Sequence, residues 1–351
     1  MAFFAIVCAL LIEQVYPLPL HNPVYHLYRQ LADWAARNLT AGKPGQGWLA
    51  WAAAVVLPTV LVAVAYLGFE SVGWLPAWLW SAAVLFVTLG FRQFSHHITG
   101  IRDALDVGDE IRARQLLAEW KSVETAHLPR SGIMRQVIEH AVLDAHRHVF
   151  GVLVAFLIGA ALGLGPAGAV LFRASEYVAR YWREQRKLGD GQMADTLPDQ
   201  AQAAWNWINW IPARATAASF AVAGNFEQAV DNWRQAASTP GTIASTDAEA
   251  VVLASAMGAV DLPWPLALDN QQDLARLPAP AGRGPAEAAD AAGGVSETGV
   301  EAYAEPEVAQ AAPATITVGM QHLQLLVGLV WRAILMWGGL IALVGFTSWI
   351  S

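Results

Sequence analysis

Charged side chains and cysteines are both scarce in this sequence. Asp, Glu, Lys and Arg make up 14% of the 351 residues, whereas an ordinary soluble domain carries about 25%. Cys8 is the single cysteine, which excludes an intrachain disulfide and any metal cluster built on several cysteines. The net charge of -8 comes partly from an acidic stretch at residues 269–307. The net charge therefore says little about nucleic-acid partners, and we expect none.

The familiar short motifs of catalysis are also missing. The sequence contains no Walker phosphate-binding loop, GxSxG nucleophile turn, HExxH zinc motif or CxxC pair. No internal repeat is visible either, which argues against a transporter, although a broken helix at residues 163–168 keeps that hypothesis open. The sequence consequently identifies no cofactor.

Long apolar runs are what the sequence does contain. Hydrophobic residues make up 55% of the chain, and about 20 consecutive apolar residues cross a bilayer core of about 30 Å. Tryptophans lie at the ends of several runs, where their rings can occupy the headgroup layer; examples are Trp48, Trp51, Trp74, Trp78 and Trp349. These features predict an integral membrane protein whose main partner is the lipid bilayer.

Four of these runs predict simple membrane helices. Residues 2–12 are apolar but lack a preceding basic residue and a following cleavage site, so we expect an uncleaved helix. Residues 48–69 and 74–91 flank a short turn and predict a transmembrane hairpin, with Pro58 as a tolerated kink. Residues 322–350 predict a final membrane helix that contains Arg332.

The run at residues 149–172 has two interpretations. It is long enough to cross the membrane, but glycines and a proline interrupt it at residues 163–168. A full crossing would place the basic segments 92–147 and 173–187 on opposite sides, whereas a re-entrant helical hairpin would keep both in the cytoplasm. Because loops rich in Lys and Arg stay cytoplasmic, we favour the hairpin.

The remaining segments predict amphipathic or solvent-exposed helices. Residues 24–39 have the spacing of an interfacial helix, and residues 92–147 predict three short cytoplasmic helices. The fold class is therefore all-α, with about five membrane segments. The other expected segments are a helix at 205–223 held by its neighbours, an Ala-rich helix at 247–260 and a disordered stretch at 265–317. This organisation divides the chain into a membrane domain at 1–262, a low-complexity linker at 263–320 and a C-terminal transmembrane helix at 321–351.

A dense group of polar residues precedes the run at residue 149. It consists of Arg135, Glu139, His140, Asp144, His146, Arg147 and His148. On a helix, His140, Asp144 and His148 are spaced by four and share one face, so they could bind a divalent metal. The alternative is a solvated or interfacial helix face.

Arg214 is unusual because it lies within an apolar segment. An arginine at membrane depth is costly and is normally paired, so Arg214 could bind an anion or a carboxylate such as Glu139 or Glu249. The alternative is an arginine whose side chain reaches the membrane surface.

The segment around Arg214 also carries a family resemblance. Residues 209–217 have the sequence NWIPARATA, which resembles the NWIPARLTA motif of the CobD/CbiB family of membrane proteins. Other elements agree in order and extend the resemblance over about residues 1–262; they are HNPV at 21–24, Arg135 with Glu139, GPAG at 165–168 and the segment 249–260. The resemblance implies that Arg135, Glu139, Asn209, Arg214 and Glu249 contribute to a ligand site.

Active members of that family form an amide between adenosylcobyric acid and an aminopropanol unit in cobalamin biosynthesis. Several acidic residues of the family pattern are replaced here, and the paired aspartates before NWIPAR become Trp205 and Asn206. These departures resemble the AmpE branch, whose members are inner-membrane sensors or signalling modulators linked to peptidoglycan recycling and the β-lactam response. The resemblance thus implies a multi-pass inner-membrane protein of AmpE type with an unknown small-molecule or protein partner. An active cobinamide synthase is the alternative, and homo-oligomerisation is left open.

Overall fold

The computed structural model describes residues 2–15, 23–39, 47–121, 130–189, 196–238, 248–262, 264 and 320–350. These residues belong to one compact unit formed by Met1–Trp264 and Val318–Ser351. Every regular element within the described ranges is a helix, which confirms the all-α prediction. The expected disordered stretch at 265–317 lies outside the described residues, and the three-part division of the chain stays a prediction.

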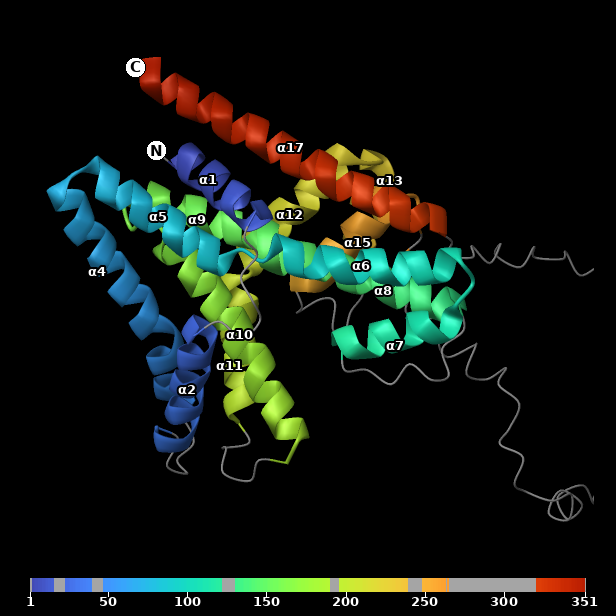
Figure 1. Ribbon diagram of the computed structural model, residues 1–351, viewed down its shortest axis with the longest axis horizontal. Coiled ribbons are helices and arrows are strands. Elements are labelled where there is room, and N and C mark those ends of the chain that lie inside the picture. The colour runs from blue at the N-terminus through green and yellow to red at the C-terminus, as the bar shows by residue number, and fades with distance from the viewer. Residues whose placement is uncertain are drawn as a thin grey trace, which may run out of the picture. The chain divides into compact units, whose positions relative to one another are not determined.

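The first half of the chain forms a membrane hairpin and a set of amphipathic helices. Gly47–Val72 is one continuous helix that includes a π-helical turn, η1, and α5 packs back against α4 (Figure 1). Trp80 Nε1 donates a hydrogen bond to the carbonyl oxygen of Val62 at 3.3 Å, which ties the two arms together. The bounds are α1 Ala2–Val15, α2 Pro23–Asn38, α3 Gly47–Trp51, η1 Ala52–Val56, α4 Leu57–Val72, α5 Trp74–Thr88, α6 Phe91–Asp106 and α7 Glu110–Lys121.

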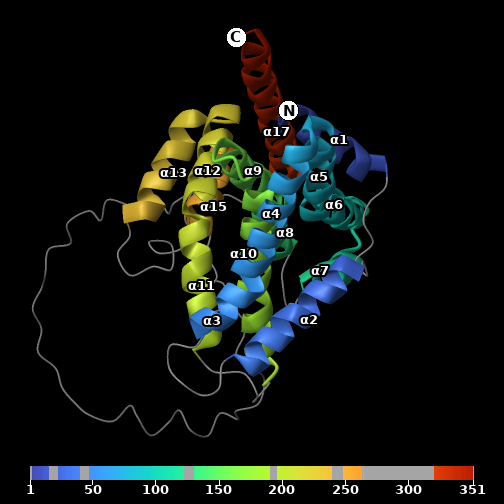
Figure 2. The same cartoon turned by 90° about the vertical axis from the view of Figure 1, so that its left-hand side faces the viewer.

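The second half forms a helical hairpin surrounded by shorter helices. In Figure 2, α12, α13 and α15 lie side by side next to α9, and α17 packs against α12 and α8. The bounds are α8 Arg130–Ala145, η2 His146–Phe150, α9 Gly151–Ala161, α10 Ala167–Lys187, α11 Leu197–Ile208, α12 Trp210–Ala223, α13 Phe226–Ser238, α15 Ala248–Ala259 and α17 Met320–Ile350.

Several helices have the length and composition of membrane spans. Three qualify by both criteria among the described residues: Gly47–Val72, Gly132–Ala161 and Gln321–Leu343. Shorter apolar helices accompany them at Phe3–Glu13, Trp74–Thr88 and Ala248–Ala259. The protein is therefore a multi-pass membrane protein.

The chain reverses at residues 162–166, as the hairpin interpretation predicted. Gly163 and Gly165 have φ values of +74° and +56°, which only glycine adopts without strain. A side chain at Gly168 would lie 2.0 Å from the carbonyl oxygen of Ala155, so glycine also permits α9 and α10 to touch. The helix before the turn begins at Arg130, because α8, η2 and α9 are continuous. The polar segment and the apolar run predicted as separate elements thus form one helical run.

The core lies along this hairpin and contains large aromatic side chains. Phe150 meets Phe220 of α12 edge to face at 5.3 Å, and Phe172 meets Trp205 of α11 at 4.9 Å between ring centroids. Trp182 of α10 is also fully buried. This packing fixes α12 against the π-helical turn η2, and α11 against α10.

The single helix predicted at 205–223 is instead two helices. It breaks at Asn209, which lies between α11 and α12. Pro212 has no backbone N–H to continue the hydrogen-bond ladder of α11, so a break one turn earlier is expected. The break turns the Asn209 side chain toward the core, where it is fully buried.

Candidate functional site

The candidate site is built on the π-helical turn η2. A π-turn holds about one residue more than an α-helical turn and is frequent at functional sites. Here it contains three consecutive polar residues, His146, Arg147 and His148. Their side chains contact three different parts of the protein.

His146 contacts both sides of the α11–α12 junction. Its ring is fully buried, with Nε2 2.8 Å from Asn209 Oδ1 and Nδ1 2.9 Å from Thr216 Oγ1. The Thr216 hydroxyl in turn donates to the carbonyl oxygen of Pro212 at 2.9 Å. These contacts hold the ring in one orientation and fix η2 to the NWIPARATA segment.

Arg147 forms a bidentate ion pair with Glu249 of α15. Arg147 Nε donates to Glu249 Oε1 at 2.6 Å, and its Nη2 donates to Glu249 Oε2. The two side chains are 22% and 10% exposed. Bidentate geometry makes such a pair strong and orients both groups. The arginine keeps the larger accessible surface and can therefore meet a ligand.

Glu176 of α10 carries a second buried charge. It accepts hydrogen bonds from Arg173 and Arg180, each at 2.9 Å, and its side chain is 4% exposed. Burial alone would raise the pKa of this carboxyl, but the guanidinium groups of Arg180 and Arg173 outweigh burial and lower it. Glu176 is therefore ionised at neutral pH.

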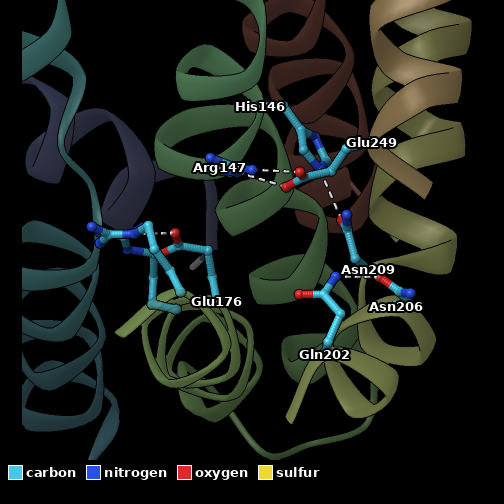
Figure 3. Close-up of polar contacts among 9 residues, drawn as sticks. His146, Arg147, Glu176, Gln202, Asn206, Asn209 and Glu249 are labelled. Carbon is cyan, nitrogen blue, oxygen red and sulfur yellow. Dashed lines mark hydrogen bonds and ion pairs between the residues drawn. The ribbon is translucent and has the colours of Figure 1, made fainter. Parts of the chain in front are cut away.

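Figure 3 shows how these groups are arranged. Arg147 and Glu249 face each other beside His146, and a dashed line joins the imidazole to Asn209 below it. Glu176 comes from a different helix, α10. The site combines a guanidinium, a carboxylate and an imidazole, and the guanidinium and the carboxylate neutralise each other.

The structure places four of the five predicted ligand residues in two separate pairs, and Arg214 in neither. Asn209 and Glu249 both belong to the site at η2. Arg135 and Glu139 pair with each other at 2.9 Å on α8. Arg135 precedes Arg147 by twelve residues, which is about 18 Å along a helix. This second pair therefore lies at a distance from the first.

Of the partners considered for Arg214, neither Glu139 nor Glu249 contacts it. The guanidinium of Arg214 lies 4.0 Å from the centroid of the Trp210 ring, one turn earlier on α12, and Nη1 donates to the Trp210 carbonyl oxygen at 3.2 Å. Both carboxylates are held by other arginines. Residues four apart on a helix are neighbours, so Arg214 finds its contacts locally.

The structure does not bring His140, Asp144 and His148 together as metal ligands. The His140 ring contacts the Trp120 ring at 6.1 Å, whereas His148 lies against Gly90, where an added Cβ would be 2.7 Å from His148 Nδ1. The metal hypothesis placed His140, Asp144 and His148 on one face of an α-helix, four residues apart. The π-turn that begins at His146 changes this geometry. Within the ranges that the structure describes, no group of three His, Cys, Asp or Glu side chains is arranged to hold a metal ion.

Sequence reasoning missed the roles of Glu176 and Thr216. The signal for Glu176 was present, because Arg173 and Arg180 lie three residues before it and four after it, the spacing of neighbours on one helix face. Thr216 lies within the motif at 209–217, but its contact with His146 depends on how distant helices pack.

Comparison with known proteins covers the part of the chain that contains this site. Residues 5–261 match the sequence model of the family described as CobD/Cbib protein. The chain belongs to the CobD/CbiB family. All the residues at η2, together with Glu176, Asn209 and Glu249, lie inside the matched range.

Two curated relatives share this family name. A protein of Stutzerimonas stutzeri called "Cobalamin biosynthesis protein CobD" is 28% identical over 239 residues, which cover 66% of this chain and 73% of the relative. A protein of Chromobacterium violaceum with the same name is 30% identical over 159 residues, covering 45% of this chain and 47% of the relative. No solved structure matches the chain.

Proposed function

We propose that this protein works in cobalamin biosynthesis in a bacterial inner membrane, where it forms an amide between a corrinoid carboxyl group and an aminopropanol unit. This reverses the preference for an AmpE-like role that the sequence motifs favoured. Family membership and the names of both relatives support the change. The site at η2 supplies the chemistry that such a reaction requires.

The observation that carries the proposal is the Arg147–Glu249 pair. Its members are 102 residues apart in the sequence, and both lie in the family-matched range. A guanidinium binds a carboxylate or phosphate through two parallel hydrogen bonds. A carboxylate binds the ammonium group of an amine. Because Arg147 Nε and Nη2 already donate to Glu249, the pair opens in the proposed reaction, so that the guanidinium meets one substrate and the carboxylate the other.

Amide formation needs an activated carboxyl group, which a nucleoside triphosphate supplies as an acyl phosphate. Arg147 orients the acyl phosphate, and Glu249 accepts the proton that the attacking amine loses. The new bond joins nitrogen to the acyl carbon, and the bond from that carbon to the phosphate oxygen breaks.

Complementation of a strain lacking its cobinamide synthase tests the proposal. We expect the wild-type gene to permit growth without supplied corrinoid, and we expect Glu249→Gln and Arg147→Lys to abolish it. Arg114→Gln is the matched control, because Arg114 pairs with Glu110 on the surface of α7. No growth with the wild-type protein shown to be in the membrane would overturn the proposal.

An AmpE-like modulator of signalling is the second candidate. It is favoured by one observation: Glu139 and Glu249, the acids retained from the family motifs, each have an arginine partner. A carboxylate held by an arginine is a weaker base than a free one. This candidate predicts failed complementation together with a changed response to β-lactams in a deletion strain.

A further inference from the structure

A cavity of about 420 Å³ lies between α2, α4, α5 and α10, away from the Arg147–Glu249 pair. Its volume falls within the range of small-molecule sites, roughly 300–1,000 Å³. Its walls include Pro58 and Val62 of α4, Trp80 and Val84 of α5, and Val170 of α10. The occupant must therefore be largely apolar.

Tyrosines line the part of the cavity formed by α2 without making it polar. The Tyr28 hydroxyl donates toward the carbonyl oxygens of Ala54 and Ala174, at 3.0 and 3.2 Å, and the Tyr25 hydroxyl donates to that of Val87 at 3.3 Å. Because these hydroxyls already have backbone partners, the rings present their apolar faces to the cavity.

The cavity is bounded on one side by a helix with the length and composition of a membrane span. One wall is the helix Gly47–Val72, a candidate membrane span of which 11% is buried inside the protein. Side chains adjacent to the lining residues, such as Leu61 and Val64, are each 60% exposed. The cavity wall and the exposed side of this helix are both largely apolar, as an acyl chain that reaches the cavity from the bilayer requires.

A cationic rim borders the tyrosine part of the cavity. Arg180 lies over the ring of Tyr177 at 5.8 Å, Tyr177 stacks on Tyr181 at 5.5 Å, and Arg29 lies over Tyr181 at 5.4 Å. Both arginines are exposed. The rim arginines, Arg29 and Arg180, have three charged neighbours: Arg173, Asp33 and Glu176. These three arginines and two acids give a local charge of +1.

We propose that this cavity binds one acyl chain of an anionic membrane phospholipid, with the headgroup phosphate held by Arg29 and Arg180. The hydrocarbon lies among Val62, Trp80 and Val84. An apolar cavity beside a cationic rim matches a lipid whose chain lies in the bilayer and whose phosphate lies at the surface. This proposal does not rest on the proposed amide-forming reaction.

Native mass spectrometry of the full-length protein in mild detergent tests the site. The probes are phosphatidylglycerol and phosphatidylcholine with the same acyl chains. We expect phosphatidylglycerol to bind about tenfold more tightly, because each rim arginine interacts favourably with an anionic lipid. The double variant Arg29→Gln/Arg180→Gln should remove this difference, whereas Arg183→Gln, on the exposed surface of α10, should keep it.

Filling the cavity with a large side chain provides a second test. Val62→Trp places an indole in the cavity and should weaken phosphatidylglycerol binding about tenfold, whereas Val64→Trp, two residues away on the lipid-facing surface, should not change it. Ala83→Trp is a second blocking variant for the case that Val62→Trp does not fold. Unchanged binding in the blocking variants would overturn the proposal. So would equal affinity for the two lipids, or displacement by free glycerol 3-phosphate, which would identify a phosphate site without a chain.

Discussion

Two apolar helices of this protein, Gly47–Val72 and Gly132–Ala161, are both long enough to cross a membrane, yet they face different surroundings. Within an apolar stretch of 18 residues in each helix, 11% of the first stretch is buried inside the protein, compared with 72% of the second. Each contains a five-residue π-helical turn, Ala52–Val56 in the first and His146–Phe150 in the second. The two helices therefore have the same irregularity in their backbones, but their side chains contact different surroundings.

The residues of the two π-turns differ accordingly. The first contains alanines and valines, whereas the second contains His146, Arg147 and His148. Charged groups at membrane depth are costly and require partners. The buried helix has such partners in Glu249, Asn209 and Thr216. An apolar composition alone thus does not distinguish a lipid-facing helix from one that carries a site.

The largest effect is expected from breaking the buried ion pair. Arg147→Met leaves Glu249 buried without its partner and should lower the free energy of unfolding by about 4 kcal/mol. The double variant Arg147→Met/Glu249→Met removes both charges and should recover most of this loss while complementation still fails. Thermal unfolding in detergent and the growth assay measure the two effects. Equal stability of wild type and Arg147→Met would contradict the pairing.

The next effect compares the same truncation in both helices. Leu153 is 3% exposed and Leu61 is 60% exposed. Leu153→Ala leaves a cavity in the core and should cost about 3 kcal/mol, whereas Leu61→Ala at the lipid-facing surface should change stability by about 0.5 kcal/mol or less. Melting temperatures of the two variants, measured in one detergent, check the difference. Similar losses would mean that another chain covers the first helix.

Glu176→Gln should cost about 2 kcal/mol at neutral pH, because it removes hydrogen bonds between charged groups. The pKa of Glu176 is lowered in the folded protein. Its contribution is therefore complete above the ordinary pKa of glutamate and is lost as the pH falls toward the lowered value. The stability difference between wild type and variant should shrink below about pH 4. A difference that grows on acidification would show that Glu176 is protonated in the folded state.

The smallest effects come from adding one methyl group to each helical hairpin. Gly168→Ala places a Cβ 2.0 Å from the Ala155 carbonyl oxygen and should cost about 1–2 kcal/mol by separating α9 from α10. Gly68→Ala meets no atom within 4 Å and should stabilise α4 by about 0.5 kcal/mol. Thermal unfolding of the pair should therefore show shifts of opposite sign.

Much of the fold could be predicted from local patterns. The hairpin of α4 and α5, the helices α2 and α15, and the reversal at residues 162–166 all follow from apolar runs and from glycine positions. The break at Asn209 was missed because the residues on both sides have helical composition. The site was predicted only in part, with Asn209 and Glu249 placed in it and Arg214 assigned the wrong partner.

The sequence by itself determined that this is an all-α membrane protein of the CobD/CbiB family, because apolar run length, glycine and proline positions and the NWIPARATA motif are all local features. Only the tertiary structure decided that Arg147, rather than Arg214, pairs with Glu249. Helical periodicity orders residues within a few turns, but these two residues are 102 apart. Their contact depends on how the helical run carrying η2 packs against α15, and no local pattern specifies that packing.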